Sequence, residues 1–229
     1  MSEPTYFNQL EQGSDEWLAI RCGALTASTI GNLFTSKGAP SYAAGTKTYA
    51  LEKAAERMTE HVEPMFYTAA MARGHRDEEI ARDLYSDNYA KVHETGFVTR
   101  EFTTDEGTAT IGYSPDGLVG DHGLIEIKSR AQKYQMRTIV ADEVPAEYMW
   151  QIQTGLLVTG RDWLDFISFC GGMALFVKRV EPDLELHTKI IDRAVAFETE
   201  VREYMDAYRK NACNAIVPPR PEEDEEMHI

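Results

Sequence analysis

Cysteine is scarce in this sequence, and long apolar runs are absent from it. The 229 residues include three cysteines, Cys22, Cys170 and Cys213, and no two of them form a CxxC pair. This spacing argues against a zinc or iron–sulfur site and favours a reducing compartment. No apolar run approaches the length of a membrane span, and no basic-then-apolar leader opens the chain. We therefore expect a cytoplasmic protein without a membrane segment.

Basic residues are also few. The chain has 23 Lys and Arg against 38 Asp and Glu, a formal net charge of −15. Binding to nucleic acid depends on Lys and Arg contacts to phosphate, so this balance opposes it. Part of the excess lies in an acidic segment, Glu222 to Glu226. A nucleic-acid function therefore requires the remaining basic residues to gather on one surface.

The length and composition favour one large domain. With 43% hydrophobic residues the chain can bury a substantial core, and it contains no internal repeat or linker. We expect a single domain over residues 1–217 and a disordered acidic tail over 218–229.

A central stretch, residues 108–130, combines strand-forming residues with turn residues and charges. A β-branched run at 108–113 and a second run at 124–129 predict two strands that form a hairpin through a Gly-rich turn at 120–123. Side chains alternate along a strand, so Glu126 and Lys128 are expected on one face. Asp116 follows the first strand, which predicts two carboxylates and an amine at one sheet edge.

That trio suits metal-assisted cleavage of a phosphodiester. Mg²⁺ prefers hard oxygen ligands and is typically held by one or two carboxylates plus substrate phosphate. Asp116, Glu126 and the Ile127 carbonyl could hold it, and Lys128 could orient or deprotonate water or stabilise charge on the phosphorane. The alternative is an edge hairpin whose charges are merely solvated. The spacing of the three residues does not by itself separate these readings.

The N-terminal region predicts a second polar site. Ser14 followed by two acidic residues reads as a helix N-cap, and Gly23 reads as the stop of that helix. A second helix is expected to begin at 26–28. Arg21 and Ser28 would then flank a helix-to-helix turn, where a guanidinium and backbone amides can meet an anion. A surface ion pair is the alternative for Arg21.

The rest of the chain predicts alternating helices and strands. A Gly/Ser/Lys loop is expected at 35–47, helices at 48–61, 67–86, 131–141, 146–158 and 183–209, and strands at 96–102, 163–169 and 174–180.

Two pairs of polar residues on these helices leave the register open. Glu78 and Glu79 diverge by about 100° around a helix, and Gln151 and Gln153 by about 200°. Only one member of each pair can therefore face a given site. A Gln inside an otherwise apolar helix needs hydrogen-bond partners.

Five short motifs occur in series, and together they resemble one family. They are Trp17 with Arg21-x-Gly23-x-x-Thr26-Ala27-Ser28, Gly74-x-x-x-Glu78, Ser114-Pro115-Asp116-Gly117, Glu126-x-Lys128 and Tyr148-Met149-x-Gln151-x-Gln153. In this order they are similar to the YqaJ-type viral recombinases and alkaline exonucleases of the PD-(D/E)xK nuclease superfamily. The resemblance implies an α/β fold with a restriction-endonuclease-like core, a central mixed β-sheet flanked by α-helices.

The resemblance also implies an activity. Members are Mg²⁺-dependent, processive 5′→3′ exonucleases on linear double-stranded DNA, and Mn²⁺ is expected to substitute for Mg²⁺. They release 5′-mononucleotides, leave a 3′ single-stranded overhang, and act as a ring-shaped homotrimer. A phage-type single-strand annealing protein is the expected partner, in a bacterial host cell.

The resemblance also assigns roles to the residues of a metal site. Asp116 and Glu126, with the Ile127 backbone oxygen, match metal ligands, and Lys128 matches the catalytic lysine. Glu78 matches a carboxylate that binds or orients a second metal and water, with Glu79 as the fallback.

The remaining roles concern the DNA. Gln151 matches the glutamine of the active-site helix, which would leave Gln153 structural. Arg21, Ser28 and Ser114 match a 5′-phosphate pocket, and Met71 a wedge that separates the terminal base pair. Four basic residues are expected to line the DNA path: Lys37, Lys47, Lys133 and Arg137. This expectation comes from their positions in loops and on helices, and no family motif supports it.

Three other functions are alternatives to this one. A structure-specific or restriction-like endonuclease on the same fold is the main alternative. An iron–sulfur nuclease of the Cas4 type would need cysteines that this chain lacks. A DNA-end-binding module with a dead site would lack Asp116, Glu126 or Lys128, and all three are present.

Overall fold

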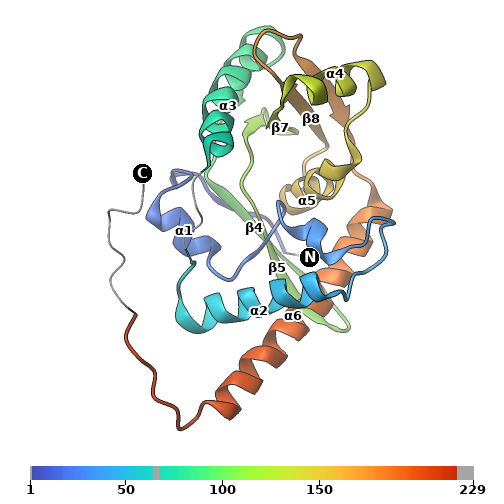
Figure 1. The fold of residues 1–229 in the computed structure, drawn as a ribbon. Helices are drawn as coiled ribbons and strands as arrows, with labels where there is room; N and C mark the ends of the chain where they lie inside the picture. The colour runs from blue at the N-terminus through green and yellow to red at the C-terminus, as the bar shows by residue number, and fades with distance from the viewer. Residues whose placement is uncertain (1, 64–67, 221–229) are drawn as a thin grey trace.

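The computed structural model describes residues 2–63 and 68–220 (Figure 1). The α-helices are α1 (Asp15–Arg21), α2 (Ala44–Thr59), α3 (Ala69–Asn88), α4 (Gln132–Ala141), α5 (Met149–Thr159) and α6 (Leu184–Asn211). Two short 3₁₀ helices are η1 (Ile30–Leu33) and η2 (Ala146–Tyr148). The strands are β1 (Thr5–Phe7), β2 (Leu25–Thr26), β3 (Val92–His93), β4 (Phe97–Thr104), β5 (Gly107–Tyr113), β6 (Gly117–Val119), β7 (Gly123–Ser129), β8 (Trp163–Phe169) and β9 (Phe176–Val180).

The strands form two mixed sheets. One has the order β1-β4-β5-β2, and the other has the order β3-β6-β7-β8-β9. β2 runs parallel to β5, and β7 runs parallel to β8, whereas the other pairs are antiparallel. The predicted α/β class is confirmed, with two mixed sheets flanked by helices where one central mixed sheet was expected.

The predicted pairing of strand 108–113 with strand 124–129 is wrong. β5 pairs with β4, and β7 pairs with β6 and β8 in the other sheet. Pro115 lies just after β5, and a proline has no N–H to continue a ladder. The chain therefore leaves the first sheet after Tyr113 and enters the second sheet at Gly117.

Helices cover both sheets and enclose two apolar clusters. The larger cluster lies between the β4–β5 sheet and the helices α2, α5 and α6, and α2 and α6 lie side by side below that sheet in Figure 1. The smaller cluster packs Ala81 and Tyr85 of α3 against Ile125 and Ile127 of β7. The predicted alternation on β7 is confirmed, because Glu126 and Lys128 bond to one another on the opposite face.

One predicted helix is wrong, and others begin a few residues from the expected place. The helix expected from Thr26 is a two-residue strand followed by η1. Hydroxyls of Thr26, Ser28 and Thr29 bond to one another there, and such local bonds compete with helix formation. α3 begins at Ala69 with Thr68 as its N-cap, and the expected first residue, 67, lies outside the described residues.

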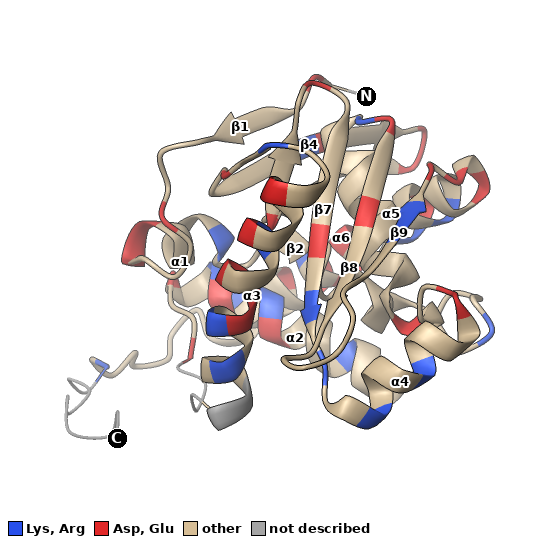
Figure 2. Ribbon diagram, turned by 90° about the horizontal axis from the view of Figure 1, so that it is seen from above, with Lys and Arg blue, Asp and Glu red and all other residues tan. Residues whose placement is uncertain are grey.

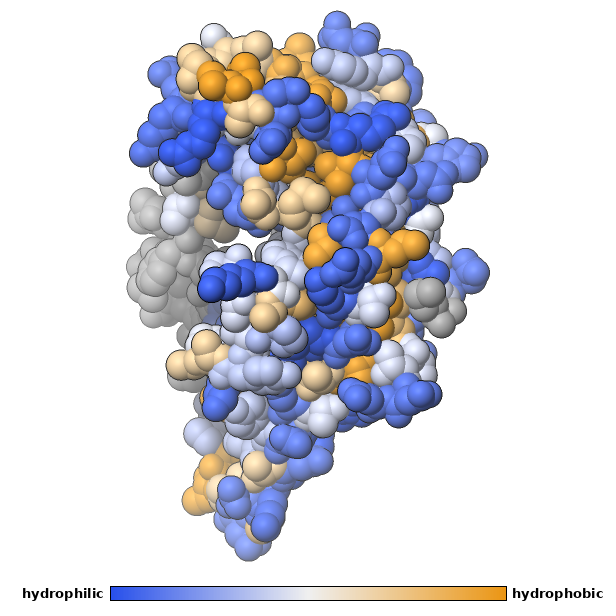
Figure 3. Space-filling model, turned by 90° about the vertical axis from the view of Figure 1, so that its right-hand side faces the viewer, coloured by the Kyte–Doolittle hydropathy of each residue, from blue (hydrophilic) through white to orange (hydrophobic). Residues whose placement is uncertain are grey.

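The exposed apolar side chains are spread over several elements. On the face shown in Figure 3, apolar patches are separated by hydrophilic side chains. Val140 on α4 is 77% exposed and Leu184 at the start of α6 is 75% exposed. Among the helices of residues 2–63 and 68–220, none has the length and apolarity needed to cross a membrane. Of the expected tail, 221–229 lie outside the described residues.

Candidate active site

Glu126 on β7 is the centre of the polar site. Its side chain is buried. Three side chains donate hydrogen bonds to it, and only one of them, Lys128, is close to it in the sequence. Oε2 accepts a hydrogen bond from the Tyr113 hydroxyl at 2.8 Å. Oε1 accepts from Lys128 Nζ at 2.7 Å and from Gln151 Nε2 at 2.5 Å. Since Tyr113 ends β5, this carboxylate joins the two sheets where they meet.

Asp116 lies beside Glu126 on the loop between β5 and β6. Its Oδ2 accepts from the Ile127 N–H at 2.6 Å, and Arg82 Nε donates to its carbonyl at 2.9 Å. Burial raises the pKa of Asp116 well above its usual range, and the negative charges of Glu126 and Glu78 raise it further. The loop is thus held by Arg82 and by the Ile127 N–H, while the Asp116 carboxylate interacts with the charges of Glu126 and Glu78.

Glu78 on α3 is the third carboxylate of the group. Burial raises its pKa, Glu126 adds to that shift, and Arg82 opposes it. Arg82 Nη2 lies 2.5 Å from Glu78 Oε1. Glu79 is exposed on the next helical position. Helix geometry therefore places Glu78, and not Glu79, beside Glu126.

Lys128 is the cation paired with Glu126, at 2.7 Å. Burial by itself would lower the pKa of Lys128, but Glu126 and Asp116 raise it above its ordinary value. Its ammonium also lies 5.5 Å from the ring centre of Tyr148. Tyr148 in turn contacts Arg130, which bonds to Glu147 at 2.9 Å.

The donor set fits a hard divalent cation. Carboxylate oxygens are the ligands that Mg²⁺ prefers, and the mutual repulsion of Asp116, Glu126 and Glu78 leaves negative charge that a cation would offset. Across residues 2–63 and 68–220, no group of three His, Cys, Asp or Glu side chains is arranged to hold a metal ion unaided. Mg²⁺ commonly uses only one or two carboxylates, with waters and substrate phosphate completing the shell.

A second polar site adjoins this one. A pocket of about 120 Å³ brings together residues from α1, the following loop, the end of β5 and α5. Its lining is Trp17, Arg21, Thr26, Ala27, Ser28, Tyr113, Ser114 and Gln151. The three residues predicted to bind a 5′-phosphate are therefore together, and Tyr113 and Gln151 belong to both sites. A larger, open recess of about 780 Å³ near the N-terminus is lined by residues 6–11, 14 and 16 and contains none of the predicted residues.

Arg21 is fixed in that pocket before any anion binds. Ser114 Oγ accepts from Arg21 Nη1 and from Trp17 Nε1, each at 3.0 Å. The guanidinium lies 4.1 Å from the centre of the Trp17 ring. Burial lowers the pKa of Arg21 to about 10. This partly desolvated cation remains charged at neutral pH and suits an anionic ligand.

The other predicted residues do not line this pocket. Gln153 is buried on another side of α5, where it donates to the Glu181 carbonyl and accepts from the Asp183 N–H. Met71 is 38% exposed in the first turn of α3. Lys37 and Lys47 are both exposed.

The basic residues of α4 are gathered around one aromatic ring. The Lys133 and Arg137 cations lie 4.8 and 5.8 Å from the ring centre of Tyr134. Figure 2 shows basic residues along α4, whereas acidic residues alternate with basic ones along α3.

Sequence reasoning missed two residues of the site. Tyr113 reads in the sequence only as a strand residue, although it directly precedes Ser114 and its buried side chain lines the pocket. Arg82 had a usable signal, because it lies four residues after Glu78 on one helix and such pairs meet.

A comparison with protein-family models matches residues 16–162 to the YqaJ-like viral recombinase domain. All five motifs, from Trp17 to Gln153, lie within that range. The chain belongs to the YqaJ-like viral recombinase family.

Solved structures agree with this YqaJ-like assignment. The chain is similar to an alkaline exonuclease from Laribacter hongkongensis, with 33% identity and a TM-score of 0.76 over 89% of this chain and 100% of that one. A structure of the same enzyme in complex with dAMP matches with the same values. A phage-related exonuclease from Haemophilus somnus 129PT shares the fold at 14% identity and a TM-score of 0.52, over 82% of this chain and 96% of that one. A comparison with curated proteins found no match. Family and full-length likeness together support a DNA exonuclease, that is, a deoxyribonuclease.

Proposed function

We propose that this protein is a Mg²⁺-dependent, processive 5′→3′ exonuclease on linear double-stranded DNA. It releases 5′-mononucleotides and leaves a 3′ single-stranded overhang for recombination by strand annealing. The observation that carries the proposal is the contact between the two polar sites. Gln151 lines the Arg21 pocket and bonds to Glu126, so an anion-binding pocket lies beside a carboxylate cluster.

This adjacency explains why cleavage would occur at an end. A terminal 5′-phosphate bound by Arg21, Ser28 and Ser114 would hold the first nucleotide in place. The next phosphodiester would then lie at the carboxylates, at a fixed distance from the end. An endonuclease has no need of a pocket that holds a terminal phosphate.

The carboxylate cluster supplies the cleavage chemistry in this proposal. Asp116 and Glu126, with the Ile127 carbonyl, would hold Mg²⁺, and Glu78 would serve a second ion or orient water. When bound, Mg²⁺ would stabilise negative charge on the scissile phosphate, and Mn²⁺ is expected to replace it.

The remaining side chains position these groups and add charge. The Lys128 ammonium lies against Glu126 and would stabilise the charge that develops on phosphate. The Tyr113 hydroxyl and the Gln151 amide each hold one oxygen of Glu126 and so fix its orientation.

The dAMP complex of the Laribacter enzyme supports the proposed product. A deoxynucleoside monophosphate is what remains when an exonuclease removes single nucleotides. The 33% identity between the two chains makes the same class of product the simplest expectation here.

The proposal includes the assembly and the setting. A ring-shaped homotrimer would resolve the unfavourable net charge of −15, because basic residues can line the DNA path while acidic residues face outward. Lys37, Lys47, Lys133 and Arg137 are the proposed lining residues, and Met71 is the proposed wedge at the terminal base pair. The partner would be a phage-type single-strand annealing protein, in the cytoplasm of a bacterial host.

End-labelled DNA tests the activity directly. With Mg²⁺, a linear duplex that carries 5′-phosphates should yield mononucleotides and lose one strand from each end, while closed circles should persist. Circles cut as readily as linear DNA would instead identify an endonuclease on the same fold. Arg21→Ala should abolish the preference for 5′-phosphorylated over 5′-hydroxyl ends, and light scattering should give the mass of three chains.

A further inference from the structure

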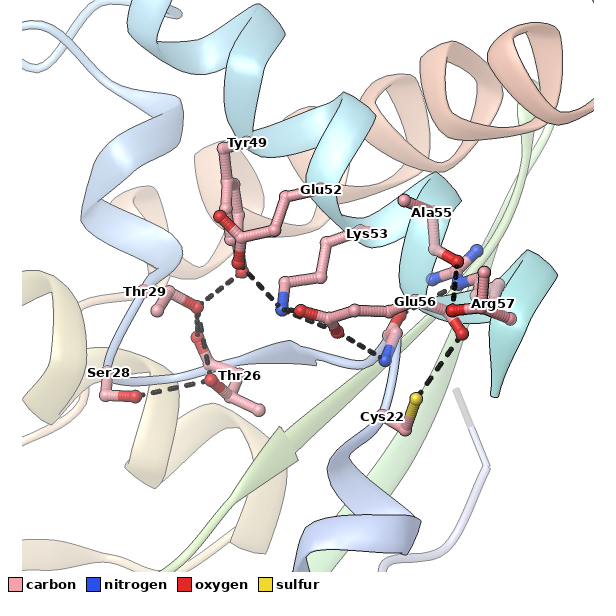
Figure 4. Close-up of polar contacts among 12 residues, drawn as sticks. Cys22, Thr26, Ser28, Thr29, Tyr49, Glu52, Lys53, Ala55, Glu56 and Arg57 are labelled. Atoms are coloured by element: carbon pink, nitrogen blue, oxygen red, sulfur yellow. Dashed lines mark hydrogen bonds and ion pairs between the residues drawn. The ribbon is translucent and has the colours of Figure 1, made fainter. Parts of the chain in front are cut away.

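The turn that follows Arg21 is held by two neighbouring residues of α2. Gly23 has a φ of +67°, in the left-handed region. Its N–H donates to Glu56 Oε2 at 2.7 Å, and its carbonyl accepts from Arg57 Nε at 2.8 Å. Figure 4 shows the Glu56 side chain reaching from α2 toward the segment that carries Cys22. Both polar groups of one residue are thus bound by adjacent side chains of another element.

Each of these two side chains is held in turn by an opposite charge. Lys53 Nζ lies 2.7 and 2.8 Å from the two oxygens of Glu56. Arg57 makes a two-pronged contact with Glu198 of α6, with both distances at 2.7 Å. Glu56 is buried and Arg57 is partly buried. Paired, partly desolvated charges of this kind are strongly directional, so the clamp on Gly23 is rigid.

The same face of α2 also holds the far end of the segment. The Tyr49 hydroxyl and Thr29 Oγ1 are 2.6 Å apart. Thr26 Oγ1 lies 3.1 Å from Thr29 Oγ1 and 3.3 Å from Ser28 Oγ. Tyr49, Lys53 and Glu56 are spaced by four and three residues, and this spacing places them on one helix face.

Between these two attachments the chain passes the phosphate pocket. Ala24 N–H bonds to the Arg21 carbonyl at 3.0 Å, so the turn at Gly23 sets the direction of the Arg21 end of α1. β2 then lies parallel to β5, with Thr26 opposite Gly112. Because β5 continues directly to Ser114, this register brings Ser28 toward Ser114 at the pocket.

We propose that Glu56 and Arg57 are positioning residues for the 5′-phosphate pocket. They act through Gly23, whose two polar groups they hold, and they keep Arg21 and Ser28 at the spacing that a terminal phosphate requires. Neither residue lines the pocket. This inference rests on the proposed binding of a 5′-phosphate by Arg21, and it adds a device that sets how strongly phosphorylated ends are preferred.

Gly23→Ala tests the clamp with a close control. A Cβ at Gly23 would lie 2.3 Å from Arg57 Cγ. The guanidinium of Arg57 is bonded to the Gly23 carbonyl and to Glu198, so relief of this overlap must disturb the bond to Gly23. Gly120 has a φ of +52°, and a Cβ there meets nothing within 4 Å. Gly120→Ala therefore places an alanine in the same backbone region without touching the clamp.

The readout is the ratio of initial digestion rates on 5′-phosphorylated and 5′-hydroxyl duplexes, with KM and kcat for each. Gly23→Ala should lower this ratio by on the order of tenfold, mainly through KM for the phosphorylated end, since displacements near 1 Å cost up to about 10²-fold. Gly120→Ala should keep the wild-type ratio. Arg57→Lys keeps a cation beside Glu198, but its single nitrogen cannot bond to Glu198 and the Gly23 carbonyl as the three nitrogens of Arg57 do. It should therefore also lower the ratio, and it is the variant to measure if Gly23→Ala does not fold.

Two comparisons separate failure of the clamp from failure of the pocket. If Arg21→Ala retains the preference for phosphorylated ends, the pocket itself is misassigned. If Arg21→Ala loses the preference while folded Gly23→Ala and Arg57→Lys keep it, the clamp has no positioning role. In the double variant, Gly23→Ala should add nothing to the loss that Arg21→Ala causes, and an additive loss would overturn the idea that the clamp acts through Arg21.

Discussion

Replacing Asp116 by Asn should stabilise the metal-free protein while it abolishes DNA cleavage. The pKa of Asp116 is raised by burial and by Glu126 and Glu78, which means that its charged form is disfavoured in the fold. Asparagine removes that charge but retains an oxygen that can accept from the Ile127 N–H. The variant therefore keeps the local hydrogen bond and loses the repulsion.

The expected gain is modest but measurable. Two like unit charges 4 Å apart repel by about 1 kcal/mol in water and by about 4 kcal/mol at an effective dielectric constant near 20. Asp116 is only partly buried, so a gain of about 1–2 kcal/mol is the reasonable range. For a chain of this size, each kcal/mol of stability shifts the midpoint of thermal unfolding by about 2–4 °C, which predicts that this midpoint rises by about 2–8 °C.

Thermal melts with and without Mg²⁺ provide the assay. Mg²⁺ at 100 times its Kd should stabilise the wild type by about 2.7 kcal/mol, and it should stabilise Asp116→Asn far less. Asp121→Asn, in the exposed turn between β6 and β7, serves as the control and should behave as the wild type in both conditions. The reasoning fails if Asp116→Asn melts below the wild type without metal, or gains as much from Mg²⁺.

Three further predictions use neighbouring residues of the site. Tyr113→Phe removes the donor to one oxygen of Glu126, so kcat should fall about tenfold, equivalent to about 1.4 kcal/mol, with KM nearly unchanged in steady-state assays. Lys128→Ala should lower kcat by about 10²–10³-fold while gel-shift affinity for DNA changes little, because phosphate contacts elsewhere position the duplex; unchanged turnover would remove its role. Gln151→Ala should reduce turnover with little change in melting temperature. Gln153→Ala removes a buried amide that bonds to two backbone groups before α6, so it should cost about 1 kcal/mol of stability and leave turnover intact; the reverse pattern would exchange their roles.

Local patterns in the sequence determined much of the active-site strand and of the first helix. The period of two along β7 placed Glu126 and Lys128 on one face, because alternation is a property of any extended chain. Ser14 caps α1 through its side-chain oxygen, as its position before two acidic residues indicates. The five motifs identified the family, which the match over residues 16–162 shows independently.

The partners of those residues were decided by tertiary structure. Periodicity shows which face of a strand is apolar, but it does not say which strand lies alongside, and so the pairing of β7 was predicted wrongly. The choices of Glu78 over Glu79 and Gln151 over Gln153 depend on how a whole helix is rotated against the sheets. That rotation is set by packing of distant residues and has no local signal.

The clamp on Gly23 is the clearest example of contacts that only the tertiary structure decides. Glu56 lies 33 positions from Gly23, and Arg57 lies 141 positions from Glu198. In the sequence these are ordinary charged residues of a helix, the commonest solvated kind. Their bonds to Gly23 and to Glu198 form only when α1, α2 and α6 close on one another, because a hydrogen bond between distant segments exists only after the fold has brought them together.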